Sequence, residues 1–419
     1  MLKRISVILV MLFMIGSSIH ATNGYFRHGY GVKYSALAGA GTALSLSSIG
    51  AATNPASLSF LNSRFDVSLA AFSPSREFTI TGNPSGYPGT FGLTPGIVES
   101  ESNFFPIPTI GLNYNLNETM SIGLMFIANG GMNTDYETAI FYDPTSNETG
   151  VNLEQMFFGA TYAIEFAENH SFGVTALMGY QKFAAKGTLS FAGFSSDPAN
   201  ISGNSNSTAT GFGARFGYQG KVLPFLTFGA SYQTKVGMSE FERYAGLFAE
   251  KGDFDVPATW NIGVAANAND DLTFALDVQQ IQYSGVNSIS NPIIPNIQTA
   301  FLGNANGAGF GWEDIMVYKF GVMYNLTSDM ILMAGYSHSD NPVASSEVLF
   351  NILAPGVVQD HISIGLSKLL EGGKEINASF TYALSNAVSG ANPLEAPNQQ
   401  TIELQMSQIQ FEVGYAFGF

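Results

Sequence analysis

The chain has 419 residues, of which 11% are charged and 13% are aromatic, and its formal net charge is −16. Soluble domains carry roughly 25% charged residues, so this composition argues against an ordinary soluble protein of several domains. The negative charge argues against a nucleic-acid partner. Cysteine is absent, which excludes disulfides and thiolate metal sites.

The first 21 residues have the pattern of an export signal. Lys3 and Arg4 form a positive end, an apolar segment runs from 5 to 15, and small residues lead to a predicted cleavage after Ala21. No later apolar run approaches the roughly 20 residues that a membrane helix needs. A chain that is poor in charge and lacks such helices can cross a bilayer as a closed β-barrel.

Residues 22–62 do not alternate like a strand and are rich in Gly, Ala and Ser, with Gly39-Ala40-Gly41 and Asn54-Pro55-Ala56 as examples. Small residues allow close backbone packing, and Pro55 biases Asn54 away from helical angles. The segment is predicted to be compact and fitted into a confined space. A flexible linker has the same composition and remains an alternative.

Residues 63–419 consist of segments in which large apolar residues recur at every second position. The clearest is 409–419, where Ile409, Phe411 and Val413 alternate with small or polar residues up to the terminal Phe419. About 14 such segments can be counted. A strand with one apolar face and one face of small or polar residues is typical of a transmembrane barrel, whose wall separates lipid from the lumen. The predicted fold class is therefore all-β, a transmembrane antiparallel barrel of about 14 strands.

The connections between these segments alternate between short turns and long loops. Short turns lie, for example, at 115–119 and 167–170. This sorting is typical of periplasmic turns and extracellular loops, so the predicted location is the outer membrane of a Gram-negative bacterium. The long loops are predicted around 74–105, 131–150, 183–208, 238–256, 284–311, 340–356 and 387–404.

The lumen-facing positions have a mixed character. Arg215 and Lys319 are candidates to bind a carboxylate, although either could instead pair with Asp277 or Glu375. Several other inward positions are apolar, which suits a hydrophobic ligand or packing against a plug better than a water-filled pore. The predicted lumen pocket consists of Met125, Ile127, Phe157, Leu177, Val317 and Met323.

Apolar residues in the predicted loop 238–256 recur at helical spacing. Phe241, Tyr244, Leu247 and Phe248 would form one face of a short helix. Such a face on an exposed loop is expected either to capture a hydrophobic molecule or to cover the mouth of the barrel.

Signals of catalysis are absent from the sequence. There is no Gly-x-Ser-x-Gly motif, and the five histidines show no metal-ligand spacing. The protein is predicted not to be an enzyme and to need neither a metal nor another cofactor.

Several blocks carry a family resemblance: Gly29 to Gly31, Gly39 to Gly41, Asn54 to Leu58, Asn129 to Thr134, Tyr244 to Phe248, Gly309 to Trp312 and Tyr415 to Phe419. Together they resemble the FadL/TodX family, outer-membrane transporters of long-chain fatty acids and other hydrophobic compounds. The resemblance implies a barrel of fourteen strands whose periplasmic end is plugged by a hatch, residues 22–62. The resemblance further implies that the hatch contains the motif residues Gly39, Gly41, Asn54, Pro55 and Ala56.

The resemblance also implies two functional features. In the family the third strand kinks inward and opens a lateral window, and Asn129, Gly130 and Gly131 are the candidates for this kink. The end of a strand would explain these residues as well. In the family two long loops form an outer hydrophobic groove, and Phe241, Tyr244, Leu247 and Phe248 are assigned to it.

The predicted function is passive uptake of hydrophobic molecules, with long-chain fatty acids as the first candidate, by way of the groove, the lumen pocket and a lateral exit. Alternatives are uptake of aromatic hydrocarbons by the same fold, or a barrel of the porin or adhesin type. The predicted partners are a fatty-acid-like or detergent-like small molecule, outer-membrane lipid, and the barrel-assembly machinery through Phe419. The protein is predicted to be a monomer.

Overall fold

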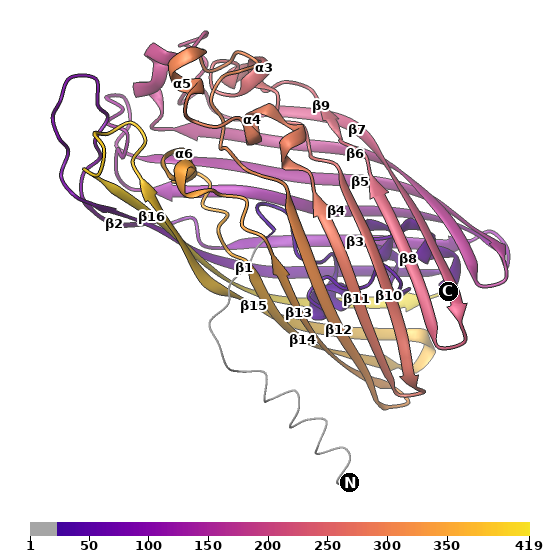
Figure 1. Ribbon diagram of the computed structural model, residues 1–419. Coiled ribbons are helices and arrows are strands. Elements are labelled where there is room, and N and C mark those ends of the chain that lie inside the picture. The colour runs from indigo at the N-terminus through magenta and orange to yellow at the C-terminus, as the bar shows by residue number, and fades with distance from the viewer. Residues whose placement is uncertain (1–22) are drawn as a thin grey trace, which may run out of the picture.

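The computed structural model describes residues 23–419, so the predicted export signal lies outside the described residues. Within this range, fourteen strands form a single antiparallel ring, which closes because the last strand, β16, pairs with the first, β1, along its whole length (Figure 1). This confirms the predicted fold class. The ring consists of β1 (Arg64–Thr81), β3 (Phe105–Asn115), β4 (Met120–Tyr136), β5 (Thr149–Ala167), β6 (His170–Lys186), β7 (Ser207–Leu223), β8 (Leu226–Gln233), β10 (Thr259–Asn269), β11 (Leu272–Ile281), β12 (Ile315–Thr327), β13 (Met330–Ser339), β14 (Asp360–Leu370), β15 (Lys374–Ala391) and β16 (Thr401–Gly418).

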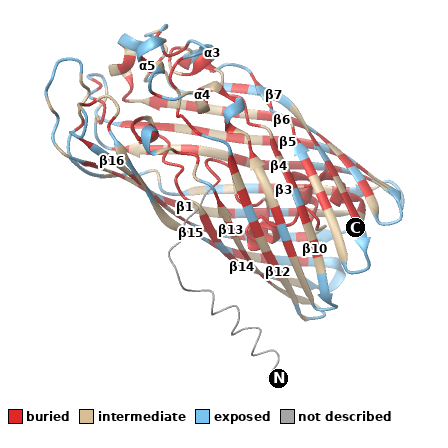
Figure 2. Ribbon diagram, viewed as in Figure 1, coloured by how far each residue is buried: buried red, intermediate tan, exposed pale blue. Residues whose placement is uncertain are grey.

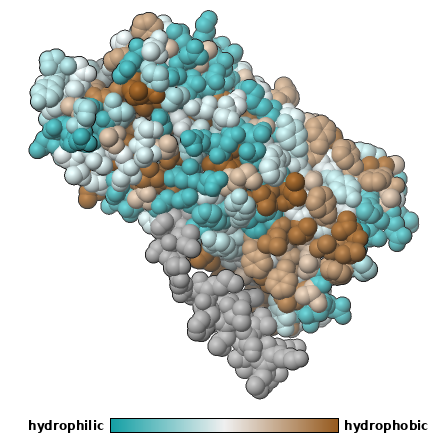
Figure 3. Space-filling model, viewed as in Figure 1, coloured by the Kyte–Doolittle hydropathy of each residue, from teal (hydrophilic) through white to brown (hydrophobic). Residues whose placement is uncertain are grey.

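The barrel has an apolar outside and a polar inside. On β16, Phe411 is 50% exposed whereas its neighbours Gln410 and Glu412 are buried, and on β14 Ile364 is 58% exposed whereas Ser363 is buried. In Figure 3 the apolar residues gather over the lower half of the barrel. A soluble protein would place these residues the other way round, so the outer surface is built for lipid.

The barrel wall is taller on one side than the sequence predicts. β1, β15 and β16 each have 18 residues, and they extend into segments that were predicted to be loops (74–105 and 387–404). Period-two alternation continues there, with Phe78 and Ile80 buried on β1 and Leu404 buried on β16. Polar residues between these apolar ones make the alternation difficult to recognise in the sequence. Two short strands, β2 (Gly96–Glu99) and β9 (Gly237–Met238), add to β1 and β7.

Short helices lie in the loops at the end of the barrel where the connections are long (Figure 1). None of the helices among residues 23–419 is both long enough and apolar enough to cross a bilayer. The α-helices in these loops are α3 (Ala249–Gly252), α4 (Asn287–Ser290), α5 (Asn296–Thr299) and α6 (Val348–Asn351), and the 3₁₀ helices are η3 (Leu189–Phe194), η4 (Glu242–Tyr244), η5 (Tyr283–Gly285) and η6 (Ser345–Glu347); a further one, η7 (Glu371–Gly373), forms a short turn.

Residues 23–62, here called the hatch, fill the lumen in the half of the barrel nearer the short turns, where Figure 2 shows a buried interior. The hatch contains α2 (Val32–Ala36), η1 (Ser48–Ala52) and η2 (Pro55–Phe60), and most of its residues are buried. Small side chains let these short helices lie directly against the strands, as the composition predicts. The position of residues 23–62 therefore agrees with a plug.

Inward-facing acids of the barrel hold the hatch through charge-assisted hydrogen bonds. The Asp277 carboxylate accepts hydrogen bonds from the backbone N–H groups of Gly41 (2.8 Å) and Thr42 (2.9 Å). The Asp66 carboxylate accepts from the Ser48 N–H at 2.9 Å. Lys33 in α2 forms a 2.7 Å ion pair with Glu375. The hatch is thus attached to several different strands.

The Asn54-Pro55-Ala56 motif joins two parts of the hatch to the wall. The Asn54 side chain donates to the carbonyl oxygens of Thr42 (2.7 Å) and Tyr218 (2.8 Å), and its own oxygen accepts from the Ala56 N–H (3.1 Å). All three bonds are lost together if the side chain is removed. Asn54 is therefore a central anchor.

Replacing Asn54 by alanine is expected to destabilise the seated hatch by about 2–3 kcal/mol, because two buried carbonyl groups lose their donors. The measurement is single-channel conductance in planar bilayers, where the variant should show frequent openings that the parent lacks. Asn306→Ala, on an exposed loop, is the matched control and should stay closed. Identical traces for Asn54→Ala and the parent would contradict the anchoring role.

Candidate functional site

The wall of the barrel has a gap between β3 and β4. Their pairing ends at Thr109 and Ile127, although both strands continue beyond this point. β3 continues along β1 only, and β4 continues along β5 after an irregularity between Ala128 and Gly130. Pro106 and Pro108 have no N–H to donate, which favours an edge position for this part of β3.

The N-terminal segment pairs with the freed part of β4. Phe26 forms an isolated antiparallel bridge with Gly130. The Arg27 N–H donates to the Asn129 carbonyl and the Gly131 N–H donates to the Tyr25 carbonyl, both at 3.2 Å. A Cβ at Gly130 would lie 2.1 Å from the Tyr25 oxygen, so only glycine permits this approach. The predicted kink residues thus lie where β4 leaves β3 and meets the segment from Tyr25 to Arg27.

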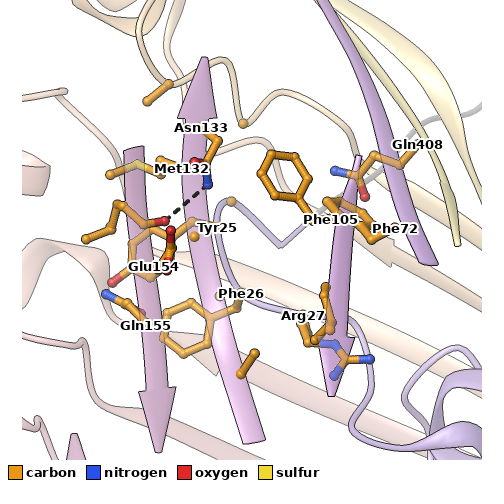
Figure 4. Close-up of a pocket in the computed structure, with 18 of the residues that line it drawn as sticks. Tyr25, Phe26, Arg27, Phe72, Phe105, Met132, Asn133, Glu154, Gln155 and Gln408 are labelled. Carbon is orange, nitrogen blue, oxygen red and sulfur yellow. Dashed lines mark hydrogen bonds between the residues drawn. The ribbon is translucent and has the colours of Figure 1, made fainter. Parts of the chain in front are cut away.

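A cavity of about 350 Å³ lies beside this gap, above the hatch. In Figure 4, Phe72 and Phe105 lie on one side of it and Met132 on the other, with the segment from Tyr25 to Arg27 between them. The volume lies within the range of small-molecule sites, and the lining is mainly apolar. Further lining residues are Leu153, Met156, Met406 and Trp312, with Asn133, Gln155, Gln408, Gln410, His28, Arg27, Arg76 and Glu154 as polar and charged ones. Glu154 is paired with Lys182 at 2.7 Å.

An aromatic cluster covers the cavity from the side of the loops. The Tyr25 ring lies 5.6 Å from that of Tyr283 and 5.9 Å from that of Trp312. The Tyr283 hydroxyl donates to the Asn23 carbonyl at 2.5 Å, and the Trp312 indole donates to Asn351 at 2.6 Å. The polar atoms of Tyr283 and Trp312 are thus satisfied, whereas the Tyr25 hydroxyl has no hydrogen-bond partner within residues 23–419. The segment that begins at Asn23 is held under the loops.

Arg76 is the cation of the cavity wall that has no carboxylate partner among the described residues. Its guanidinium donates to the carbonyl oxygens of Asn133 and Ser102 and lies 5.8 Å from the centre of the Phe105 ring. Its Nε has no hydrogen-bond partner within residues 23–419. Arg27, by contrast, is paired with Glu412 at 3.2 Å. The positive charge of Arg76 is therefore buried beside an apolar cavity without a carboxylate to compensate it.

The six residues of the predicted lumen pocket do not line this cavity, so their assignment to it is corrected. Five of them are buried, and Met125, Ile127, Phe157 and Leu177 belong to the apolar core that also contains hatch residues such as Leu58. Val317 is buried in the same core, and Met323 is half-buried near Leu37. An inward apolar pattern is common to residues that touch the hatch and residues that line a cavity, so it could not separate them. Phe72 shows this pattern too and does line the cavity.

The predicted carboxylate ligands Arg215 and Lys319 also lie outside the large cavity. Arg215 donates to the hatch carbonyls of Ala51 and Ala52 and to the Gln233 side chain. Lys319 lies opposite Asp277 in the register of β11 and β12. Both cations line a second, much smaller cavity next to the hatch.

The residues assigned to an outer groove are packed beneath the loops. Phe241, Tyr244 and Phe248 are buried around Phe183, with ring centres 5.5, 4.8 and 4.6 Å from it, and Leu247 is half-buried. The predicted short helix is a single 3₁₀ turn, η4, that does not extend to Leu247. These four side chains therefore cover the barrel mouth and form no open groove.

Exposed aromatic residues are found on the neighbouring loops. Phe194 is 47% and Phe301 is 54% exposed. Their loops are joined, because the Leu302 N–H donates to the Phe194 carbonyl at 2.7 Å and Ser195 forms a bridge with Leu302. Phe301 lies in the predicted loop 284–311 and Phe194 in the predicted loop 183–208, and their distance along the chain does not indicate that the two loops meet.

The same loop region contains a carboxyl group that should make it sensitive to pH. The pKa of Asp253 is raised to about 7 from its ordinary value of 3.8, chiefly by burial and then by the charge of Asp255, a hydrogen bond with Asp255 and the charge of Glu250, while Lys235 opposes the change. Asp255 itself is paired with Lys235 at 2.6 Å. The folded loop thus binds the Asp253 proton more tightly than the unfolded chain does.

Protection of residues 249–256 against amide exchange, corrected for the intrinsic rate, is expected to be greater at about pH 5 than at about pH 8. The stabilisation should be complete below the unfolded pKa and lost as the pH rises through about 7, because the ionised carboxylate is the unfavourable form in the fold. Asp253→Asn should remove the dependence, and Asp270→Asn in a short turn should retain it. Greater protection at the higher pH would contradict the assignment.

Comparison with known proteins gives a consistent result. The model of the family described as outer membrane protein transport protein (OMPP1/FadL/TodX) matches residues 17–416. A search of curated proteins gives no match.

Three solved structures are similar to the chain. The P. putida toluene transporter TodX has 17% identity and a TM-score of 0.69, and the match covers 94% of this chain and 99% of that chain. A Pseudomonas aeruginosa FadL homologue has 15% identity and a TM-score of 0.70, with 94% and 100% covered. The Ralstonia pickettii toluene transporter TbuX has 17% identity and a TM-score of 0.63, with 94% and 99% covered.

The structural matches, at identities of 15 to 17%, establish the fold, and the family model covers nearly the whole chain. The predicted family and the predicted outer-membrane location are thereby confirmed. The chain belongs to the outer membrane protein transport protein family (OMPP1/FadL/TodX) and is an outer-membrane transporter of hydrophobic substrates.

Proposed function

We propose that this protein takes up long-chain fatty acids passively, through the 350 Å³ cavity and out through the gap between β3 and β4. The observation that carries the proposal is the position of the cavity, which lies directly beside unpaired edges of the wall. Ile107 and Pro108 of β3 and Ala128 of β4 all line it.

The hatch supports a lateral route over a straight one. Below the cavity, hatch residues such as Leu58 and Ile49 are buried in one apolar core with the barrel wall. Movement straight through would require this core to open, at about 25 cal/mol for each Å² of apolar surface exposed to water. Movement through the gap requires displacement of the segment 23–27 alone, which contributes Tyr25 and Phe26 to this core and is bound to β4 by few backbone hydrogen bonds. The buried hatch also argues against a porin.

Arg76 favours an acid over a neutral hydrocarbon as the substrate. A carboxylate beside the guanidinium would form a charge-assisted hydrogen bond while its chain contacts Phe72, Met132 and Met406. A neutral hydrocarbon would gain nothing from the charge. Aromatic hydrocarbons are the second candidate, and the aromatic lining supports them, as does the similarity to the two toluene transporters.

Phe194 and Phe301 are the proposed point of first contact. They are exposed on joined loops, and the loop that carries Phe241, Tyr244, Leu247 and Phe248 supports them from below, since the Ser195 hydroxyl donates to the Gly246 carbonyl at 2.7 Å. These four residues would thus act as the base of the capture surface and not as its lining.

The test is uptake of radiolabelled oleate and toluene by cells with and without the gene. The proposal expects oleate uptake to depend on the gene and to compete with other long-chain acids. If only toluene uptake depends on the gene, aromatic hydrocarbons become the favoured substrates. Equal uptake of both compounds with and without the gene would overturn the proposed function.

A further inference from the structure

A second cavity, of about 20 Å³, lies between the hatch and the wall of the barrel. Three cationic side chains line it: Arg27 from the hatch, Arg215 from β7 and Lys319 from β12. Its other polar lining residues are Asn261, Gln279, His28, Tyr30, Thr53 and Thr259. A space of this size holds one water molecule or one ion of similar dimensions.

Lys319 is the residue whose position is hardest to explain without a ligand. Its side chain is 7% exposed, yet within residues 23–419 its ammonium group has neither a hydrogen bond nor an ion pair. The backbone at Gly39 leaves room for it, because a Cβ there would lie 3.1 Å from the Lys319 Nζ. An ammonium group has three donors, and leaving all of them unused in a buried site is costly.

The charges around the cavity do not balance. Arg27 is compensated by Glu412 at 3.2 Å. Arg215 has only carbonyl and amide oxygens as partners. Asp277 lies opposite Lys319 in the sheet register, but no ion pair joins the two; its Oδ2 accepts from Gly41 and Thr42, and its Oδ1 has no hydrogen-bond partner within residues 23–419. Two acids therefore face three cations.

We propose that this cavity binds one small inorganic anion of the size of chloride, held by Lys319 and Arg215 and by the amide groups of Asn261 and Gln279. A water molecule would fit the space but would leave the excess positive charge buried and uncompensated, which is strongly unfavourable. The anion would also connect β7, β12 and the hatch, so it would stabilise the seated hatch. This site is a different cavity from the large one, with which it shares Phe26, Arg27 and His28, and the proposal does not depend on the proposed substrate.

The first test is thermal unfolding of the purified full-length protein in detergent, titrated with sodium chloride against sodium gluconate at constant ionic strength. Gluconate is too large for the cavity. The expected result is a melting temperature that rises with chloride and saturates. Lys319→Met should abolish this rise, while Lys368→Met, whose lysine pairs with Asp329 at a turn, should retain it. Equal melting temperatures in the two salts would overturn the proposal.

The second test uses crystals of the parent protein grown in sodium bromide, and it remains decisive if Lys319→Met does not fold. An anomalous peak within hydrogen-bond distance of the Lys319 Nζ is the expected result. A map with no peak in this cavity, or with peaks only on the surface of the barrel, would overturn the site.

Discussion

Replacing Arg76 by methionine is expected to lower oleate uptake roughly 10- to 100-fold, because a hydrogen bond to a charged group contributes about 1.5–3 kcal/mol. Toluene uptake should change little, since a neutral hydrocarbon makes no such bond. The substitution removes the charge and the cation–π contact with Phe105, and it leaves a shorter, unbranched apolar side chain in the wall. The measurement is the initial rate of uptake of each compound at a limiting concentration, in cells with matched amounts of folded barrel.

Two further variants separate the charge of Arg76 from its role in the wall. Arg76 also donates to the carbonyl oxygens of Asn133 and Ser102, and methionine removes these bonds. Arg76→Lys keeps the charge and should restore part of the oleate uptake. Arg243→Met, on an exposed loop, is the control and should behave as the parent. If Arg76→Met reduces the uptake of oleate and toluene equally, the residue is only structural.

The barrel could be predicted from the sequence because lipid imposes a simple rule on every strand. Ile409, Phe411 and Val413 face outward in the structure as their alternation predicts, with Gln410 and Glu412 inside. The short turns were equally visible, since 115–119 and 167–170 each lie between two strands of the ring. Each of these features is determined by residues that are close together in the sequence, so it can be recognised without the fold. The alternation fixes the class and the number of strands.

The cavity could not be predicted because it depends on which strands stop pairing. Phe72, Met132 and Met406 come from β1, β4 and β16, and they meet because β3 and β4 separate above Thr109 and Ile127. Met132 lies in a stretch that was predicted to be a loop. The glycines at 130 and 131 indicated a bend in β4. They did not indicate that the segment from Tyr25 to Arg27 pairs with β4 at this bend.

The loop residues illustrate a second limit. Helical spacing identified Phe241, Tyr244 and Phe248 as one apolar face, and the structure brings them together. The spacing does not tell whether the face is open or covered. In the fold Phe183 of β6 packs against all three, because exposing so much aromatic surface would be unfavourable.

Closing the gap between β3 and β4 is expected to stop uptake. The chain has no cysteine, so cysteines introduced at Pro108 and Ala128 would be unique in it. These are the first positions beyond the last paired residues, Thr109 and Ile127. A short bis-maleimide that joins them would hold the two strand edges together. Oleate uptake should then fall to the level of cells that lack the gene, because the lateral exit is blocked while the hatch is unchanged.

The matched control joins cysteines at Leu112 and Leu124, which are already paired across the same two strands. The decisive measurement is oleate uptake after cross-linking of both pairs, with single-cysteine variants treated in the same way. Loss of uptake for the pair at 108 and 128, with normal uptake for the pair at 112 and 124, is the predicted result. Undiminished uptake through a barrel fully cross-linked at 108 and 128 would contradict the lateral route.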